Sequence, residues 1–150
     1  MNNDDEKWMA IALTLAKKAQ QQGEVPVGAI IVQDNKVIGE GWNQVIGEHD
    51  PTAHAEIKAL RAASQTIKNY RLIGATMYVT LEPCLMCAGA LIHARVDRVV
   101  FAAKEPKTGA VGSCFDVFNT QQLNHYVHCE HGVLARQSSE LLQRFFQDRR

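Results

Sequence analysis

Residues 75–103 read ATMYVTLEPCLMCAGALIHARVDRVVFAA. The two ends of this stretch, 75–81 and 97–103, are short apolar runs typical of buried strands, and the run between them, 84–95, is long enough for a helix. Pro83 suits the first turn of that helix, where its missing N–H costs nothing. A strand, a helix and a strand in this order predict two parallel strands joined by a right-handed crossover.

Helical and strand patterns also fill the sequence on either side. Apolar residues recur at helical spacing over residues 5–22, whereas 27–32 and 36–42 have the character of two strands of a hairpin that turns at Asp34-Asn35. The remaining predicted elements are a helix over 54–66, a last strand over 125–129 and a closing helix around 141–146. Together they predict one α/β domain over residues 1–150, a three-layer α/β/α sandwich whose mixed five-stranded sheet carries helices on both faces.

The composition is that of an ordinary globular protein, with 46% hydrophobic and 21% charged residues. The 16 basic and 16 acidic residues balance, so any contact with RNA must come from a local patch, and no DNA partner is expected. The polar, acidic N-terminus does not resemble a signal peptide, and no apolar run approaches the roughly 20 residues of a membrane span. Four cysteines fit a reducing compartment, which predicts a cytoplasmic protein without a membrane partner.

Three residues of the types that bind zinc stand at two places in the chain. Cys84 and Cys87 are three residues apart and therefore share one helix face. At the start of a helix the dipole favours the thiolate, which is the form that binds metal. His54 can supply a third ligand, which leaves one tetrahedral position open, as in catalytic zinc sites. The pattern predicts one Zn²⁺ ion that activates a water molecule.

Glu56 is the candidate proton shuttle beside this metal. It stands two residues after His54, and residues at that spacing do not share a helix face. Both can reach the metal only from the first turn of a helix whose end faces it. A carboxylate in that place can take a proton from water and pass it to a leaving amine.

Two other readings of the cysteine pair are weaker. A redox pair would not need His54 and Glu56 upstream, and a structural zinc site would need a fourth ligand at matched spacing. Cys114 and Cys129 are isolated from one another and from the pair. Catalytic zinc is therefore the favoured interpretation.

The pattern H-x-E…P-C-x-x-C is the signature of zinc-dependent nucleobase deaminases. Longer strings resemble the bacterial tRNA-specific adenosine deaminases over nearly the whole chain. The strings are Glu24–Ala29, Gly41–Asn43, Pro51–Glu56, Tyr78–Cys84, Met86–Ala90, Lys107–Ala110 and Phe145-Phe146. The resemblance implies a cytidine-deaminase-like fold, a homodimer with one Zn²⁺ per subunit, and conversion of the wobble adenosine of a tRNA anticodon stem-loop to inosine.

The resemblance also implies roles for single residues. It assigns the zinc ligands to His54, Cys84 and Cys87, the shuttle to Glu56, and a contact with the flipped base to Asn43. In the implied mechanism the Ala55 N–H and the Asn43 amide hold the base edge, and Val27 and Leu81 form apolar walls. Without the resemblance, Asn43 could equally serve a turn at the end of its strand.

RNA contacts are expected near two segments. Lys104, Glu105 and Lys107 stand in one loop, and Arg149 and Arg150 follow the last helix. Basic and aromatic residues together suit phosphate contact and base stacking. The alternative is a solvated loop beside an amphipathic helix, and Phe145 and Phe146 are assigned to the core because they continue the Leu141-Leu142 stripe.

The sequence departs from the family pattern at four positions, none within the zinc motif. Ala102 stands in place of glycine, Glu105 of aspartate, Tyr126 of arginine and Val45 of proline. These changes bear on the loop conformation at 102–105 and on one positive charge near 126. Two alternative functions stay open. One is a deaminase of free nucleobases or nucleosides of the guanine or cytosine type, and the other is a non-enzymatic zinc-stabilised RNA-binding module.

Overall fold

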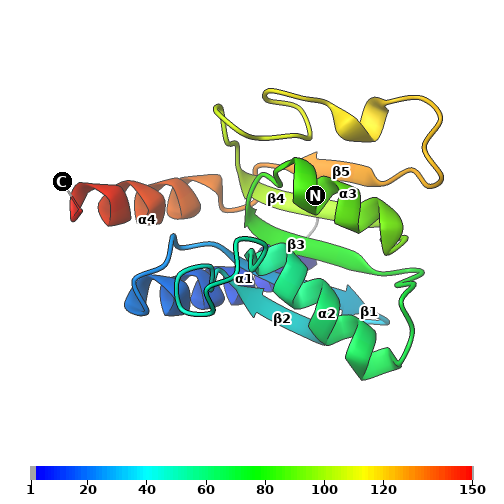
Figure 1. The fold of residues 1–150 in the computed structure, drawn as a ribbon, viewed down its shortest axis with the longest axis horizontal. Coiled ribbons are helices and arrows are strands. Elements are labelled where there is room, and N and C mark those ends of the chain that lie inside the picture. Colours follow the sequence, from blue (N-terminus) through cyan, green and yellow to red (C-terminus); the bar gives the residue numbers. More distant parts are fainter. Residues whose placement is uncertain (1–2, 150) are drawn as a thin grey trace.

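The computed structural model describes residues 3–149, and its centre is a five-stranded sheet in the order β2-β1-β3-β4-β5 (Figure 1). The strands are β1 (Gly28–Gln33), β2 (Lys36–Trp42), β3 (Thr76–Leu81), β4 (Arg98–Ala103) and β5 (His128–His131). β1 pairs antiparallel with β2 and β3, while β3, β4 and β5 are parallel. The mixed sheet and the β3–β4 crossover that the sequence predicts are confirmed.

Helices cover both faces of this sheet. They are α1 (Asn3–Gln21), α2 (Ala55–Ile67), α3 (Leu85–His93) and α4 (Ala135–Gln147), with a short 3₁₀ turn, η1, at Val117–Asn119. In Figure 1, α2 and α3 lie on one face and α1 on the other, while α4 extends beyond one end of the sheet. This is the predicted three-layer sandwich. None of the helices within residues 3–149 combines the length and the apolar character that a membrane crossing would need.

Two apolar clusters hold the three layers together, one on each face of the sheet. Ile31 and Val99 contribute to the cluster beneath α2 and α3, whereas their neighbours Ile30 and Val100 contribute to the cluster beneath α1. All four side chains are fully buried. Strands that are buried on both faces are apolar without alternation, which explains the continuous hydrophobic runs of β1 and β4.

The backbone of α2 rests directly on strand β2 at two glycines. A Cβ atom at Gly41 would lie 2.3 Å from the carbonyl oxygen of Ala55, and one at Gly39 would lie 2.5 Å from that of Ala59. No side chain fits in either place. The helix therefore packs at the closest distance its backbone allows, and its first residue is fixed above the end of β2.

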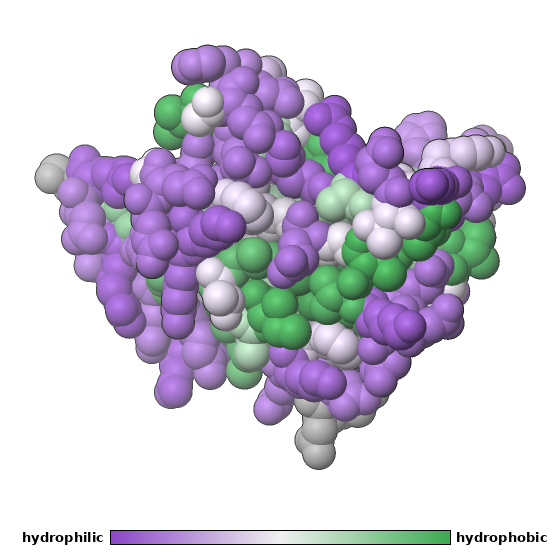
Figure 2. All heavy atoms as spheres, turned by 90° about the horizontal axis from the view of Figure 1, so that it is seen from below, coloured by the Kyte–Doolittle hydropathy of each residue, from purple (hydrophilic) through white to green (hydrophobic). Residues whose placement is uncertain are grey.

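β2 forms one open edge of the sheet. Figure 2 views the molecule from the side of this edge and shows a band of hydrophobic residues between hydrophilic flanks. A shallow groove of about 370 Å³ is lined there by residues that include Val37, Ile38 and Trp42. Lys18 Nζ lies 4.0 Å from the centre of the Trp42 ring, and Trp42 Nε1 donates to Gln22 Oε1 at 3.1 Å. Lys18 of α1 and Gln22, which directly follows that helix, thus contact the largest ring on this edge.

The predicted bounds of the last strand are wrong. The strand begins at His128 and ends at His131, pairing in register with Arg98 to Phe101. Tyr126 and Val127, whose residue types favour strands, precede the strand. Contacts with β4 decide instead, because Glu130 binds Arg98 and the His131 ring stacks on Phe101 with centroids 5.3 Å apart. Tertiary contacts commonly override intrinsic strand propensity in this way.

Arg98 joins α1 to three strands through a partly buried charge network. Its Nη2 lies 2.8 Å from Asp5 Oδ2, and the same atom binds Glu130 on β5. Tyr78 on β3 donates from its hydroxyl to Asp5 Oδ1 at 2.7 Å. Burial and the neighbouring Asp5 carboxylate raise the pKa of Tyr78 to about 12. The hydroxyl therefore keeps its proton, as the bond to Asp5 requires.

Replacing Arg98 by methionine is expected to lower the free energy of unfolding by about 3 kcal/mol, because the Asp5 carboxylate would remain buried without its cation. The value is at the low end for a buried pair, since the Arg98 side chain is 24% exposed and solvent screens it in part. Urea unfolding measures the change. The control is Arg136→Met, which removes an exposed pair with Glu140 at 3.8 Å and should change stability by less than about 0.5 kcal/mol. Equal effects of the two substitutions would contradict the role of Arg98.

Candidate metal centre and its cavity

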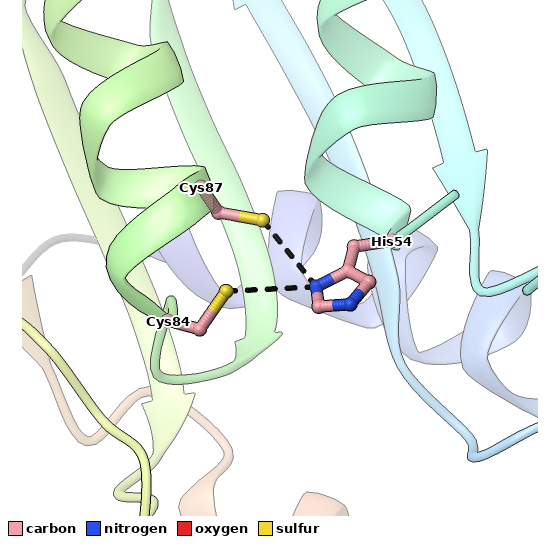
Figure 3. A group of neighbouring side chains, drawn as sticks. All are labelled: His54, Cys84 and Cys87. Carbon is pink, nitrogen blue, oxygen red and sulfur yellow. Dashed lines mark hydrogen bonds between the residues drawn. The ribbon is translucent and has the colours of Figure 1, made fainter. Parts of the chain in front are cut away.

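The N-termini of α2 and α3 converge on the candidate metal centre (Figure 3). His54 is the N-cap residue of α2 and Cys84 that of α3, and neither side chain caps its own helix. Both have extended backbone, with φ −72° and ψ 153° at His54 and φ −80° and ψ 178° at Cys84. Cys87 lies in the first turn of α3. The three side chains therefore point at one place from two helix ends, where the dipoles favour thiolate.

The distances between these side chains fit zinc. His54 Nδ1 lies 3.6 Å from Cys84 Sγ and 3.6 Å from Cys87 Sγ. Zinc bonds of about 2.3 Å to sulfur and about 2.05 Å to nitrogen, set at the tetrahedral angle, would hold those atoms about 3.6 Å apart. Within residues 3–149 this is the one group of three or more His, Cys, Asp or Glu side chains whose ligand atoms all lie within 4.8 Å of one another.

Hydrogen bonding between the two cysteines makes them unequal. The Cys87 thiol donates to the Cys84 sulfur, and this bond, supported by His54, lowers the pKa of Cys84 to about 4. The same bond, together with burial, raises the pKa of Cys87. The hydrogen bond to Cys84 also raises the pKa of His54. One thiolate is therefore favoured at neutral pH, and metal binding must displace the proton of the other thiol.

Glu56 lies in the first turn of α2, as a shuttle beside this centre requires. Its side chain is 4% exposed and lines the same cavity as His54 and Cys84. Burial raises the pKa of Glu56 to about 7, and the nearby Cys84 acts in the same direction. A carboxylate that can gain and lose a proton near neutrality suits general acid–base work.

The cavity above the candidate ligands has a volume of about 430 Å³, which is within the range of small-molecule sites. Val27 and Leu81, the two apolar walls expected from the sequence, both line it. Val25 and Phe145 add further apolar surface, and Asn43 contributes an amide. Such a lining is complementary to a ligand with a flat, mostly apolar ring that carries a few polar atoms at its edge.

Asn43 holds the start of α2. Its Oδ1 accepts a hydrogen bond of 2.8 Å from the Ala55 N–H, which would otherwise lack a partner in the first turn of the helix. The Ala55 N–H, expected from the sequence to face a base, is thus already engaged by Asn43. The Nδ2 donor of Asn43 has no protein partner within the described residues.

The expected RNA-contact residues lie unequally around the cavity. Glu105 and Arg149 line its mouth, and Lys107 lines an adjoining open groove of about 680 Å³ together with Phe146. Lys104 is exposed but lines neither space. The expected contact Arg150 lies outside the described residues.

The two phenylalanines of α4 have different environments. Phe145 is buried, and the Arg149 guanidinium lies 3.7 Å from the centre of its ring. Phe146 is 50% exposed, so its assignment to the core is wrong. The helix turns about 100° per residue, and on α4 this places Phe145 against the interior and Phe146 towards solvent.

Two of the four departures from the family pattern touch the cavity. Val45 and Glu105 line it. Ala102 is buried within β4 beneath α1, and Tyr126 is exposed, with its hydroxyl 3.3 Å from the Leu123 N–H. The first two therefore bear on the shape of the rim, whereas the latter two lie away from it.

Sequence reasoning missed two buried carboxylates that line the cavity, Glu24 and Glu82. Glu24 accepts hydrogen bonds from the backbone N–H groups of Ile46 at 3.1 Å and Gly47 at 2.8 Å. Glu82 binds the loop that follows β4. Both residues belong to sequence segments that resemble the family. Each is a charged residue next to an apolar strand, which is the feature of the sequence that could have indicated them. Their partners are distant in sequence and could not be inferred.

Comparisons with known proteins agree with this geometry. The family model of the cytidine and deoxycytidylate deaminase zinc-binding region matches residues 2–103. The tRNA-specific adenosine deaminase of Haemophilus influenzae is 55% identical over 147 residues, which is 97% of this chain and 85% of that protein. The protein of the same name from Buchnera aphidicola subsp. Baizongia pistaciae is 46% identical over 150 residues, which is 100% of this chain and 93% of that protein.

A solved structure is similar over almost the same length. It comes from biochemical and structural studies of A-to-I editing by tRNA:A34 deaminases at the wobble position of transfer RNA. The two chains are 40% identical with a TM-score of 0.88, and the match covers 91% of this chain and 99% of the other. The chain therefore belongs to the cytidine and deoxycytidylate deaminase family and, within it, to the tRNA-specific adenosine deaminases.

Proposed function

We propose that this protein hydrolyses the adenosine at the wobble position of a tRNA anticodon to inosine and ammonia. The observation that carries the proposal is the convergence of His54, Cys84 and Cys87 on one point, with buried Glu56 lining the same cavity as His54 and Cys84. Relatives named tRNA-specific adenosine deaminases match nearly the whole chain and support the RNA substrate. The proposal includes one Zn²⁺ per subunit, a homodimer, a cytoplasmic location and a single catalytic domain over residues 1–150.

The metal would be held by His54 Nδ1 and by the sulfurs of Cys84 and Cys87. Bound there, zinc would make a water molecule acidic enough to react at neutral pH. Glu56 takes a proton from that water on its carboxylate and delivers it to the ring nitrogen next to C6. It then takes the remaining proton from the new hydroxyl at C6 and transfers it to the amine. In the net reaction a C6–O bond forms, the C6–N bond breaks and ammonia leaves.

The remaining cavity residues would bind the base. An adenosine in a loop is already unstacked, so turning it into a pocket costs less than in a duplex. Val27 and Leu81 pack against the faces of the ring, and the Nδ2 atom of Asn43 donates to an acceptor on its edge. Ala55 contributes through its N–H, which holds Asn43 in place.

We assign RNA contact to Lys104, Glu105, Lys107, Arg149 and Arg150. The basic residues attract phosphate, and half-exposed Phe146 offers a ring for stacking in the groove next to the cavity. Because the chain as a whole carries no net charge, this local patch must provide the attraction.

The test is to incubate zinc-loaded protein with an anticodon stem-loop that carries a wobble adenosine and to measure inosine. Inosine is expected from this RNA and not from free adenosine. Raising the salt concentration from about 50 to about 200 mM should raise KM about tenfold, because a few phosphate contacts release counterions. Ammonia from free guanine or cytosine, without inosine in the RNA, would instead establish a free-base deaminase. Light scattering at working concentration tests the homodimer, and a monomer would contradict it.

A further inference from the structure

Glu82 binds the loop that forms one side of the cavity mouth, residues 104–113. Its side chain is 3% exposed. Oε1 accepts from the Glu105 N–H at 3.1 Å and from the Ser113 hydroxyl. Oε2 accepts from the N–H groups of Val111 and Ser113, each at 3.1 Å. Four donors from three points of the loop thus meet on one carboxylate.

This arrangement requires a carboxylate. An ionised carboxyl group offers about four acceptor sites and no donor, whereas glutamine would turn an NH₂ group towards loop donors. Aspartate is shorter by one methylene. No ion pair with Glu82 is found among residues 3–149, so these loop donors are what solvates the buried group.

Gly109 lets the loop close around Glu82. A Cβ atom at Gly109 would lie 2.4 Å from Glu82 Cδ, so the constraint is space and not backbone conformation. The next residue, Ala110, donates its N–H to the carbonyl of Pro83 at 2.9 Å. The loop is therefore bound to the two residues that come directly before the candidate ligand Cys84.

The loop carries residues that face the cavity and the groove beside it. Glu105 and Thr108 line the cavity, and Lys107 lines the groove. The Lys107 N–H also donates to Glu105 Oε1 at 2.9 Å. The position of these side chains relative to the candidate metal centre follows from the position of the loop.

We propose that Glu82 is a positioning residue, which fixes the 104–113 loop over the cavity and thereby sets the affinity for RNA. Its four hydrogen bonds occupy both oxygens, so it acts through the loop and not on the reacting atoms. The expected effect on RNA affinity rests on the RNA substrate proposed above. The hold of Glu82 on the loop rests only on the hydrogen bonds described here.

Glu82→Gln is the main test, with Glu140→Gln on the exposed face of α4 as the matched control. In Glu82→Gln, hydrogen exchange measured by mass spectrometry should be at least about tenfold faster for the amides in 104–113. In the wild type, hydrogen bonds to the charged carboxylate protect these amides, and the substitution weakens those bonds. Zinc content should stay at the wild-type value. KM for the stem-loop should rise about tenfold or more, with kcat changed by less than about threefold. The control should leave all four quantities unchanged.

Ser113 provides a second pair of variants if Glu82→Gln does not fold. Ser113→Ala removes one of the four donors and should shift exchange and KM in the same direction by a smaller factor. Ser113→Thr keeps the hydroxyl and should restore wild-type behaviour.

Three results would overturn the proposal: unchanged exchange in the loop, faster exchange with unchanged KM, or loss of zinc with a matching fall in kcat. If the wild type forms no inosine, the proposed function fails by itself. In that case faster exchange with full zinc content would support the hold of Glu82 on the loop, and unchanged exchange would overturn it.

Discussion

Replacing Glu56 by glutamine is expected to lower kcat for inosine formation by about 10²–10⁴-fold, the usual contribution of a positioned acid–base group. Glutamine has nearly the same shape but can neither accept nor return a proton. Because Glu56 is not among the three candidate ligands, the variant should keep its zinc. Single-turnover formation of inosine in the anticodon stem-loop, with metal content measured on the same sample, checks both statements.

The control for this substitution is Glu40→Gln, an exposed residue of β2 that lies away from the cavity. It should leave kcat within about twofold of the wild type, as expected for a surface change. Unchanged inosine formation by Glu56→Gln would contradict the shuttle role of Glu56. RNA binding without inosine formation in both the wild type and Glu56→Gln would favour a zinc-stabilised RNA-binding module. Loss of zinc from Glu56→Gln would instead make this carboxylate part of the metal site.

Cys87→Ala is expected to abolish both zinc binding and deamination. Cys87 is fully buried, and only His54 and Cys84 would remain as protein ligands. A metal that binds the native state stabilises it against unfolding. The variant should therefore unfold at the temperature of chelator-treated wild type, and added zinc should raise the midpoint of the wild type only. Calorimetry with and without added zinc measures this difference.

Cys129→Ala is the matched control, because Cys129 is a partly buried thiol on β5 whose pKa burial raises to about 12. It should lose about 1 kcal/mol of packing and keep its zinc and activity. A Cys87→Ala protein that still binds zinc at the wild-type ratio would show that the metal uses other ligands.

Local pattern and spacing predicted most of the fold and the centre of the site. Strand β3, helix α3 and strand β4 follow from apolar runs of characteristic length, because both faces of the sheet are covered. Cys84 and Cys87 share a helix turn by spacing alone. His54, 30 residues earlier than Cys84, could be paired with them because histidine and thiolate ligands are chemically matched for zinc.

The features that sequence did not predict depend on contacts between distant segments. β5 has the polar sequence HCEH, and only its pairing with β4 makes it a strand. Phe146 differs from Phe145 because only one of the two adjacent positions on α4 packs against the rest of the protein. The partners of Glu82 lie 23 to 31 residues further along the chain, and no periodic pattern connects them to it.

The contact between α2 and the glycines of β2 makes the metal geometry sensitive to an edge strand that holds no ligand. A methyl group added at Gly39 or Gly41 would meet main-chain atoms, which cannot rotate aside as a core side chain can. The whole helix would have to lift, and it would carry His54 and Glu56 away from the cysteines of α3. The distances between His54 and the two cysteines therefore depend on Gly39 and Gly41 having only a hydrogen atom where other residues carry a side chain.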